Sequence, residues 1–251
     1  MLEAREVCVS FGGVRAVDHV SLTLDEREIL GVIGPNGSGK TTLLNALTGV
    51  VKTTGSLRVD GEDVGLGSMT RSRRAGIVRM FQAPQTVDEL TCLENVLLST
   101  SDSSRRGLLG ATFLRRSMGR HERARWQRAS EALDFVGLRG VASQSAADLT
   151  YGQRRLIDLA RVVAADASVV LLDEPSAGLN DHETTKLADL CLELRSQGMA
   201  VIVVEHKIDF VDRLCDRIMV LELGRVVAEG PPDVVWKDQR VMDAYLGVPR
   251  A

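Results

Sequence analysis

Apolar residues in this chain occur in short blocks, and the blocks alternate between two spacings. Continuous or alternating apolar runs, which predict strands, lie at 6–10, 20–24, 28–34, 76–81, 169–173, 200–206, 217–224 and 225–230. Apolar positions three and four residues apart, which predict helices, lie at 40–50, 152–164, 181–197 and 208–216. Strands and helices in alternation predict a mainly parallel sheet that helices cover on both faces.

Two segments depart from this alternation. The predicted strands at 6–10 and 20–24 look antiparallel. The segment 55–64 predicts two more short strands, joined by a turn at Asp60 and Gly61. We therefore expect a small antiparallel side sheet. Residues 87–148 contain helical patterns without a buried strand, which predicts an inserted helical subdomain. We place this subdomain at 87–157, within a single domain over 1–251 whose core is formed by 1–86 and 158–251.

Composition indicates a packed core and limits the partners. The 251 residues are 44% hydrophobic and 26% charged, with a net charge of −3, and this lack of a basic excess argues against nucleic acid. No apolar run reaches the roughly 18–20 residues that a membrane-spanning helix needs. The cysteines lack paired spacing, so we expect reduced, mostly buried thiols and no metal site. They are Cys8, Cys92, Cys191 and Cys215.

A glycine-rich segment between a predicted strand and a predicted helix carries the clearest chemistry. The sequence GPNGSGKT at 34–41 fits the P-loop pattern G-x-x-x-x-G-K-[ST], in which backbone N–H groups and the helix start face phosphates. Lys40 adds a positive charge, and Thr41 offers a hydroxyl to Mg²⁺. The expected nucleotide-binding residues here are Gly34, Pro35, Asn36, Gly37, Ser38, Gly39, Lys40, Thr41 and Thr42.

Two carboxylates follow the apolar strand predicted at 169–173, whose carboxyl end is expected beside the glycine-rich loop. Asp173 is suited to hold Mg²⁺, directly or through water. Glu174 is placed to polarise an attacking water as a general base. An isolated pair of this kind would be read as solvated acids at a strand end, but the nucleotide loop favours the catalytic interpretation.

A second polar turn opens the helix in LTYGQRRLIDLARVV at 149–163. Together with the P-loop and the two carboxylates after the strand at 169–173, this turn makes the chain resemble an ATP-binding-cassette (ABC) ATPase over nearly its whole length. LTYGQ resembles the family signature LSGGQ, a turn that contacts the γ-phosphate of ATP held by a second subunit. Tyr151 replaces the first glycine, Gly152 still permits close backbone approach, and Thr150 also suits a plain helix cap. The implied contacts to ATP are Thr150, Tyr151, Gly152 and Gln153.

Three single residues take their roles from the resemblance alone. Gln82 resembles the glutamine that reaches Mg²⁺ and the attacking water and senses the transporter. His206 resembles the switch histidine that contacts the γ-phosphate, and Phe11 resembles the aromatic residue that stacks on adenine. Their plainer interpretations are a surface amide, a structural strand-end histidine and a core aromatic side chain.

The resemblance also implies further features of the site. Residues 176–181 resemble the loop that crosses the dimer interface, and Lys207 stands where the family commonly has Asp. The implied fold class is the P-loop NTPase (RecA-like) α/β fold, with a mainly parallel sheet core, an antiparallel β side sheet and an inserted helical subdomain. The implied catalytic residues are Lys40, Gln82, Glu174 and His206. The implied metal ligands are Thr41, Gln82 and Asp173.

Several segments resemble one branch of this family, the branched-chain amino acid importers. They are LTYGQRRLIDLAR, LLDEPSAGLN, the insertion at 100–130 and the C-terminal segment from EHKIDF to DAYLG. Urea and short-chain amide importers share these features. The resemblance implies a peripheral protein on the cytoplasmic face of the cell's inner membrane. Its implied partners are a second ABC ATPase subunit, identical or paralogous, the transmembrane permease subunits and, indirectly, an extracytoplasmic substrate-binding protein.

Two other functions stay open. A soluble, non-transport ABC ATPase that remodels DNA or ribosomes would usually carry two cassettes, long coiled coils or zinc modules. A non-catalytic nucleotide-binding regulator would not need the set of Lys40, Asp173, Glu174 and His206. Arginines in the insert favour a solvated helix face over contact with anionic lipid. They are Arg105, Arg106, Arg115, Arg116, Arg120, Arg123, Arg125 and Arg128.

Overall fold

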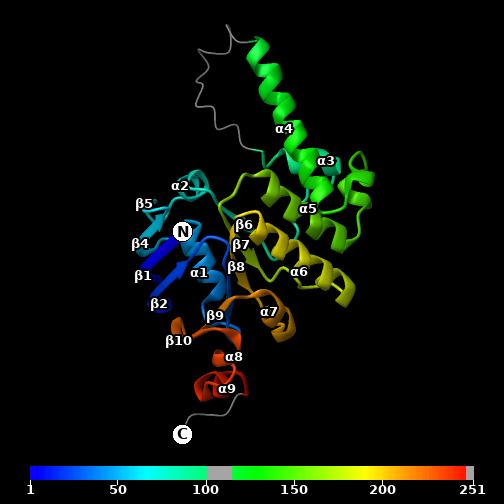
Figure 1. The fold of residues 1–251 in the computed structure, drawn as a ribbon. Helices are drawn as coiled ribbons and strands as arrows, with labels where there is room; N and C mark the ends of the chain where they lie inside the picture. Colours follow the sequence, from blue (N-terminus) through cyan, green and yellow to red (C-terminus); the bar gives the residue numbers. More distant parts are fainter. Residues whose placement is uncertain (101–114, 247–251) are drawn as a thin grey trace. The chain divides into compact units, whose positions relative to one another are not determined.

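The computed structural model describes residues 1–100 and 115–246 of the chain (Figure 1). The chain forms two compact units, which we call the core unit and the helical unit. The core unit comprises Met1–Gln82 and Ala167–Ala251, and the helical unit comprises Ala83–Asp166. Among the described residues, no helix has the length and apolar character needed to cross a membrane.

A six-stranded sheet in the order β10-β9-β3-β8-β7-β6 forms the centre of the core unit. Its strands are β3 (Ile29–Ile33), β6 (Ile77–Met80), β7 (Val169–Asp173), β8 (Ala200–Val204), β9 (Arg217–Glu222) and β10 (Arg225–Gly230). All pairs are parallel except β9 with β10. Every residue of β3, β7 and β8 is buried, which explains why their sequences are continuously apolar. Because β3, β6, β7 and β8 are parallel, their carboxyl ends lie at the same edge of the sheet.

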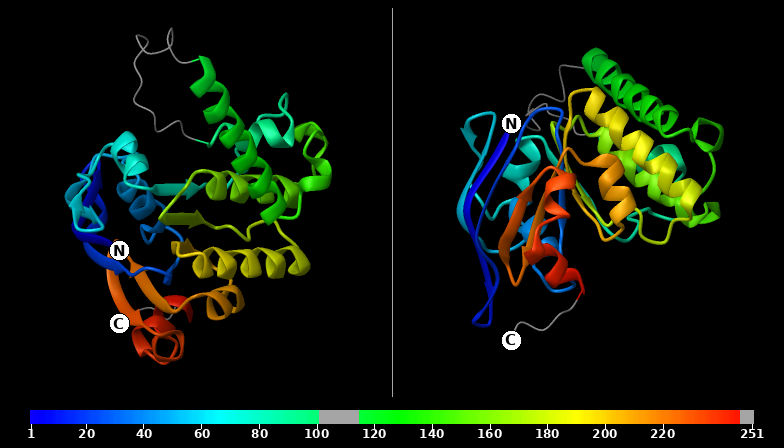
Figure 2. Two further views of the ribbon diagram at one scale, coloured as in Figure 1. Left: turned by 45° about the horizontal axis from the view of Figure 1, so that its top comes forward. Right: turned by 60° about the horizontal axis from the view of Figure 1, so that its bottom comes forward.

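A second, four-stranded antiparallel sheet in the order β2-β1-β4-β5 completes the core unit (Figure 2). Its strands are β1 (Leu2–Phe11), β2 (Val14–Leu24), β4 (Thr54–Val59) and β5 (Glu62–Asp63). The first two strands are longer than the predicted runs at 6–10 and 20–24, because their pairing continues through register shifts that interrupt the apolar pattern. One hydrophobic cluster joins this sheet, helix α1 (Lys40–Leu47) and the central sheet, and it includes Leu2, Val20 and Leu43.

The remaining helices of the core unit are α2 (Met69–Arg74), α6 (Asp181–Ser196), α7 (Ile208–Leu214), α8 (Pro232–Val235) and α9 (Gln239–Leu246). The sequence pattern predicted α6 and α7 but not α2, α8 or α9. Helices α2 and α8 are six and four residues long, too short to show helical periodicity. The predicted strand at 200–206 ends at Val204, so Glu205 and His206 lie in the following loop.

The helical unit contains α3 (Cys92–Leu97), α4 (Arg115–Phe135) and α5 (Tyr151–Ala164), which contact one another, and two short 3₁₀ helices at Arg139–Val141 and Ala146–Asp148. The boundary expected at 157 falls inside α5. The helical unit instead begins at Ala83 and includes the whole of α5, which contacts both α3 and α4.

The predicted insertion at 100–130 is described only in part. Arg105 and Arg106 lie outside the described residues, and so do the side chains of Arg115, Arg116 and Arg120. Arg125 is half-buried, and its Nε donates to Thr100 Oγ1 at 3.0 Å. This arginine therefore holds the end of the α3 segment against α4 within the helical unit.

Candidate nucleotide-binding and catalytic site

The P-loop connects the carboxyl end of β3 to the first residue of α1, as the sequence predicts. Gly34 and Gly39 have φ angles of +148° and +105°. A Cβ atom at Gly34 would lie 2.1 Å from the carbonyl oxygen of Leu221, and one at Gly39 would lie 2.3 Å from that of Ala16. No other residue type fits these two positions without moving the backbone.

The side chain of Lys40 folds back over this loop. Its Nζ donates hydrogen bonds to the carbonyl oxygens of Gly34 at 2.8 Å and Pro35 at 3.0 Å. Lys40 is 6% exposed, and burial lowers its pKa, while the nearby carboxylates of Glu174 and Asp173 act in the opposite direction. The adjoining pocket has a volume of about 180 Å³ and is lined by Ala16, Asn36, Gly37, Gly39, Lys40, Thr41, Thr42 and Glu174.

Asp173 ends β7 and lies against the P-loop helix. Thr41 Oγ1 donates to its Oδ1 at 3.4 Å, and the guanidinium of Arg79, on β6, lies 2.5 Å from its Oδ2. Arg79 also donates to Asn45 Oδ1 on α1 and stacks over the ring of Phe81 at 4.7 Å. Sequence reasoning missed Arg79, although an arginine inside an apolar strand is itself a signal, since such a charge needs a partner when buried.

Glu174 contacts two residues that the sequence predicted separately. Its Oε2 accepts a hydrogen bond from Gln82 Nε2 at 2.7 Å, and its Oε1 lies 2.7 Å from His206 Nε2. Gln82 lies in the loop after β6, and His206 lies in the loop after β8. These two strands flank β7 in the sheet. The backbone at Glu174 has a φ of +43°, a conformation that non-glycine residues rarely adopt and that is often found at functional sites.

Glu205 fixes the loop around His206, and its role was not predicted. It is 2% exposed, and its carboxylate accepts hydrogen bonds from the backbone N–H groups of Ser176 and His206, each at 2.9 Å. Lys207 Nζ lies 3.5 Å from the carbonyl oxygen of Ser176. The segment 176–181 then leads into α6, whose start Asn180 caps. Glu205 and Lys207 therefore connect the loop of His206, which the sequence related to the γ-phosphate, to the segment 176–181, which the sequence related to the dimer interface.

Phe11 lies at the end of β1 and is 52% exposed. An aromatic side chain this exposed is not part of the core, so the interpretation of Phe11 as a core residue is wrong. The exposed ring is available for stacking against a planar ligand.

The turn that resembles the family signature opens α5 in the helical unit. Thr150 Oγ1 accepts from the N–H of Gln153 at 3.2 Å, and Gln153 Oε1 accepts from the N–H of Thr150 at 2.9 Å, which forms a capping box. Gly152 is buried, and Tyr151 is 42% exposed as the first helical residue. A helical backbone at Tyr151 explains why a residue with a side chain is accepted there.

Comparison with known proteins decides the family. A family model described as ABC transporter matches residues 17–177. The high-affinity branched-chain amino acid transport ATP-binding protein BraF of Pseudomonas aeruginosa is 36% identical over 249 residues, with 98% of each chain covered. The chain belongs to the ABC transporter family. A second ABC relative, LivG of Escherichia coli, bears the same description and is 36% identical over 250 residues, again with 98% of each chain covered.

Solved structures agree with this membership. A nucleotide-free ATP-binding cassette from an ABC transporter matches with a TM-score of 0.85 and 28% identity, covering 100% of this chain and 99% of that one. A cassette solved as a dimer in a post-hydrolysis state with ADP and Pi matches with a TM-score of 0.74 and 26% identity, over 92% and 99% of the chains. The predicted ABC ATPase identity and P-loop NTPase fold are therefore confirmed.

Proposed function

We propose that this protein is the ATP-hydrolysing subunit of an importer for branched-chain amino acids. The observation that carries the ATPase mechanism is the position of Glu174, which contacts Gln82 and His206 and lines the P-loop pocket. The transport role is supported by the names of BraF and LivG, both branched-chain amino acid transport ATP-binding proteins. Importers of urea or short-chain amides are the alternative, because the cassette does not contact the transported solute.

ATP binding is assigned to the P-loop and the exposed aromatic residue of β1. The backbone N–H groups of the loop and the start of α1 face the phosphates. Lys40 would exchange its two carbonyl partners for phosphate oxygens, and Phe11 would stack on adenine. The assigned P-loop residues are Gly34, Pro35, Asn36, Gly37, Ser38, Gly39, Lys40, Thr41 and Thr42.

The donors beside the P-loop fit Mg²⁺, which prefers oxygen ligands. Thr41 Oγ1 and Asp173 Oδ1 lie 3.4 Å apart, so a hydroxyl and a carboxylate oxygen converge on one place. Gln82 would add its amide oxygen after releasing Glu174. When bound, Mg²⁺ neutralises charge on the phosphate oxygens during phosphoryl transfer.

Hydrolysis is assigned to the carboxylate of Glu174. A water that replaces the Gln82 amide at Oε2 would lie within hydrogen-bond distance of a base, and Glu174 would take its proton as the water attacks the γ-phosphorus. His206, held by Glu205 and adjacent to Oε1, and Lys40 would stabilise the charge on the transferring phosphoryl group. The leaving group is ADP, and the product is inorganic phosphate.

We infer that each active site needs two copies of the cassette, which are identical or paralogous. The signature-like turn of Thr150, Tyr151, Gly152 and Gln153 would contact the γ-phosphate held by the partner's P-loop. The dimeric cassette with ADP and Pi supports this arrangement. ATP-driven closure would then act on transmembrane permease subunits, served by an extracytoplasmic substrate-binding protein, from the cytoplasmic face of the cell membrane.

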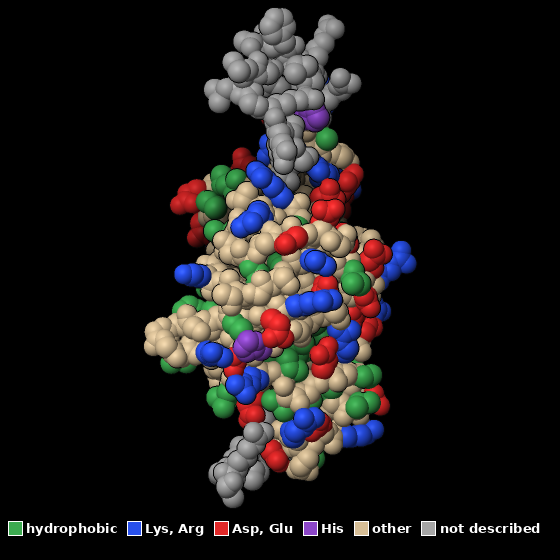
Figure 3. Space-filling model, turned by 90° about the vertical axis from the view of Figure 1, so that its left-hand side faces the viewer, with side chains coloured by type: hydrophobic (Ala, Val, Ile, Leu, Met, Phe, Trp, Pro, Cys, Tyr) green, Lys and Arg blue, Asp and Glu red, His purple; other side chains and the backbone are tan. Residues whose placement is uncertain are grey.

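Nucleic acid is not proposed as a partner. The net charge is −3, and on the face drawn in Figure 3 basic and acidic side chains are interspersed among the described residues. A nucleic-acid-binding surface usually gathers its basic residues on one face. Affinity purification from membranes is the check: permease subunits should co-purify, and recovery with ribosomes or DNA-repair proteins would contradict the importer assignment.

Replacement of Glu174 by glutamine tests the ATPase mechanism. Glu174→Gln keeps the shape of the side chain and removes the base, so it should bind ATP with near wild-type affinity and release phosphate at least about a hundredfold more slowly. Glu193→Gln, an exposed change on α6, is the matched control and should hydrolyse ATP normally. Normal turnover by Glu174→Gln would show that another group is the base.

A further inference from the structure

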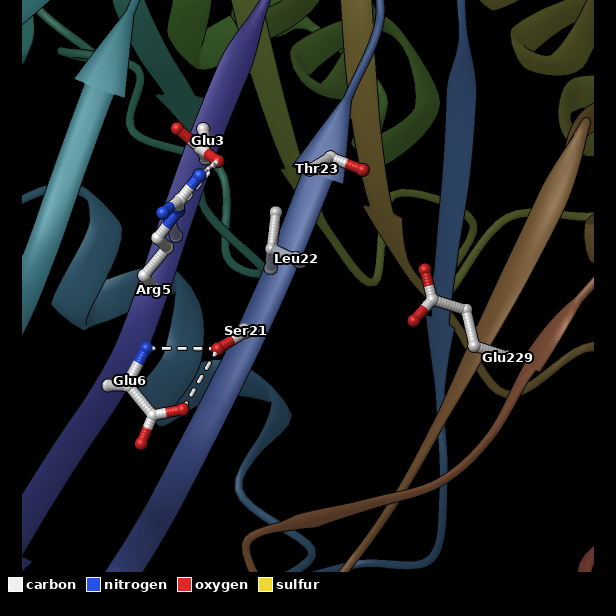
Figure 4. A pocket seen from close by; sticks show the side chains of 8 residues that line it. Glu3, Arg5, Glu6, Ser21, Leu22, Thr23 and Glu229 are labelled. Carbon is white, nitrogen blue, oxygen red and sulfur yellow. Dashed lines mark hydrogen bonds and ion pairs between the residues drawn. The ribbon is translucent and has the colours of Figure 1, made fainter.

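An irregular place in the β1–β2 pair gathers side chains that the ATPase mechanism does not use. The register of the two strands shifts between Ala4 and Val7 and again between Val7 and Val9. Glu6 and His19 have φ angles of +51° and +53°. The backbone N–H of Glu6 donates to Ser21 Oγ at 3.0 Å, and the two side chains also contact each other (Figure 4).

This irregularity brings consecutive side chains to one place. In a regular strand Asp18 and His19 would project to opposite faces of the sheet. Instead, one ligand atom each from Cys8, Asp18 and His19 lie within 4.8 Å of one another. His19 Nε2 and Asp18 Oδ1 are 3.8 Å apart. Ligand atoms that share a tetrahedral Zn²⁺ are separated by about 3.3–3.6 Å, so a small closing movement would suffice.

We propose that Cys8, Asp18 and His19 form a binding site for Zn²⁺, with water as the fourth ligand. A thiolate, an imidazole and a carboxylate form a donor set that zinc commonly takes in proteins. The sequence argued against a metal site because the cysteines lack paired spacing, but these three donors come from two strands and no spacing rule would find them.

The surroundings orient the donors as a metal site requires. Glu6 Oε2 lies 2.7 Å from His19 Nδ1, which leaves Nε2 to face Asp18. A carboxylate on the second ring nitrogen is the usual companion of a zinc-bound histidine. The backbone N–H of His19 points at Cys8 Sγ at 3.2 Å and would stabilise a thiolate there. Glu6 is therefore a positioning residue for the site.

Two arginines compete with the metal for Asp18. Arg15 Nη1 donates to Oδ1 at 2.8 Å, and Arg225 binds Oδ2, with Nη2 at 2.6 Å. Their side chains are 61% and 72% exposed, while that of Asp18 is 6% exposed. Zn²⁺ would displace the exposed Arg15 from Oδ1 and leave Arg225 in place. Removal of Arg15 should consequently strengthen metal binding, an effect that a purely structural ion pair would not produce.

Cobalt titration of the metal-free full-length protein, without nucleotide, tests the site. One Co²⁺ per chain should produce the near-ultraviolet absorption of a cobalt–thiolate bond, and Zn²⁺ should remove it. Cys8→Ser should abolish this absorption. His19→Asn, which suits a positive φ, should weaken binding at least about tenfold. Arg15→Gln should tighten it. Because the readout needs no ATPase activity, it fails or succeeds independently of the proposed function.

Cys191→Ala is the matched control. Burial raises the pKa of the Cys191 thiol to about 12, so this thiol is not expected to bind the metal, and the variant should titrate like the wild type. Absence of cobalt–thiolate absorption from the wild-type protein would overturn the proposal. So would an absorption that survives in Cys8→Ser, or an unchanged affinity in both His19→Asn and Arg15→Gln.

Discussion

Arg79 and Asp173 form a buried ion pair between two neighbouring strands of the central sheet, and each side chain is 4% exposed. The second amino group of Arg79 binds Asn45 on α1, the helix that carries Lys40 and Thr41. A single guanidinium thus links the strand before Gln82, the carboxylate assigned to Mg²⁺ and the P-loop helix.

Loss of this guanidinium should destabilise the protein strongly. Arg79→Met would leave the buried carboxylate of Asp173 without its ionic partner, and we expect the free energy of unfolding to fall by about 3–5 kcal/mol. Denaturant unfolding followed by circular dichroism measures this. Arg123→Met, at an exposed position of α4, should change the value by less than about 0.5 kcal/mol. Equal effects of the two changes would refute the role of the ion pair.

Glu205 should matter for turnover more than for nucleotide binding. Glu205→Ala would leave the N–H groups of Ser176 and His206 without their shared acceptor, and the loop that positions His206 would shift. We expect kcat to fall by about a hundredfold with little change in the Kd for ATP. Single-turnover hydrolysis and equilibrium nucleotide binding separate the two. A weaker ATP affinity with normal kcat would contradict the positioning role.

Phe11 should contribute to ATP affinity without contributing to stability. An aromatic stacking contact is worth about 0.5–1.5 kcal/mol, so Phe11→Ala should raise the Kd for ATP by roughly two- to tenfold, and Phe11→Tyr should restore the affinity. Val14→Ala, at the position of β2 that pairs with Phe11 and 69% exposed, serves as the control, because it removes an exposed side chain without removing an aromatic ring. Unchanged ATP affinity in Phe11→Ala would show that Phe11 does not stack on adenine.

The capping box of α3 predicts a defined acid dependence of stability. Hydrogen bonds from the backbone N–H and the hydroxyl of Thr91 hold the pKa of Glu94 below its ordinary value of 4.5. A lowered folded-state pKa gives stability that is present above the ordinary value and lost as pH falls through the lowered one. The stability difference between wild type and Glu94→Gln should therefore be constant near neutral pH and shrink below 4.5. A difference that grows in acid would reverse the assignment.

Sequence alone predicted the parts of the fold and the site that depend on residues close together along the chain. The P-loop and the apolar strands β3, β8 and β7, the last of which ends in Asp173, depend on neighbouring residues, so pattern and motif suffice. Short helices such as α2 and α8 carry too few residues for a periodic signal. The limits expected for the helical subdomain, 87 and 157, differ from the limits of the helical unit, Ala83 and Asp166, because hydrophobic periodicity shows where a helix lies and not which unit it packs in.

The contacts of Arg79, Glu205 and His19 could not be predicted from the sequence, for a different reason. Each depends on partners that are distant along the chain, such as Arg79 with Asp173, or on a local backbone irregularity, such as the positive φ of His19. Hydrophobic periodicity carries no information about either. Only the folded arrangement shows which partners these side chains have.

We infer that ATP hydrolysis requires two cassettes, each of which completes the other's active site. The most direct measurement is the ATPase rate per chain over a range of protein concentrations, with the dimer fraction in MgATP followed by analytical ultracentrifugation. The rate per chain should rise in proportion to the dimer fraction and approach zero in the monomer. A rate that stays constant while the sample is monomeric would show that a single cassette hydrolyses ATP alone.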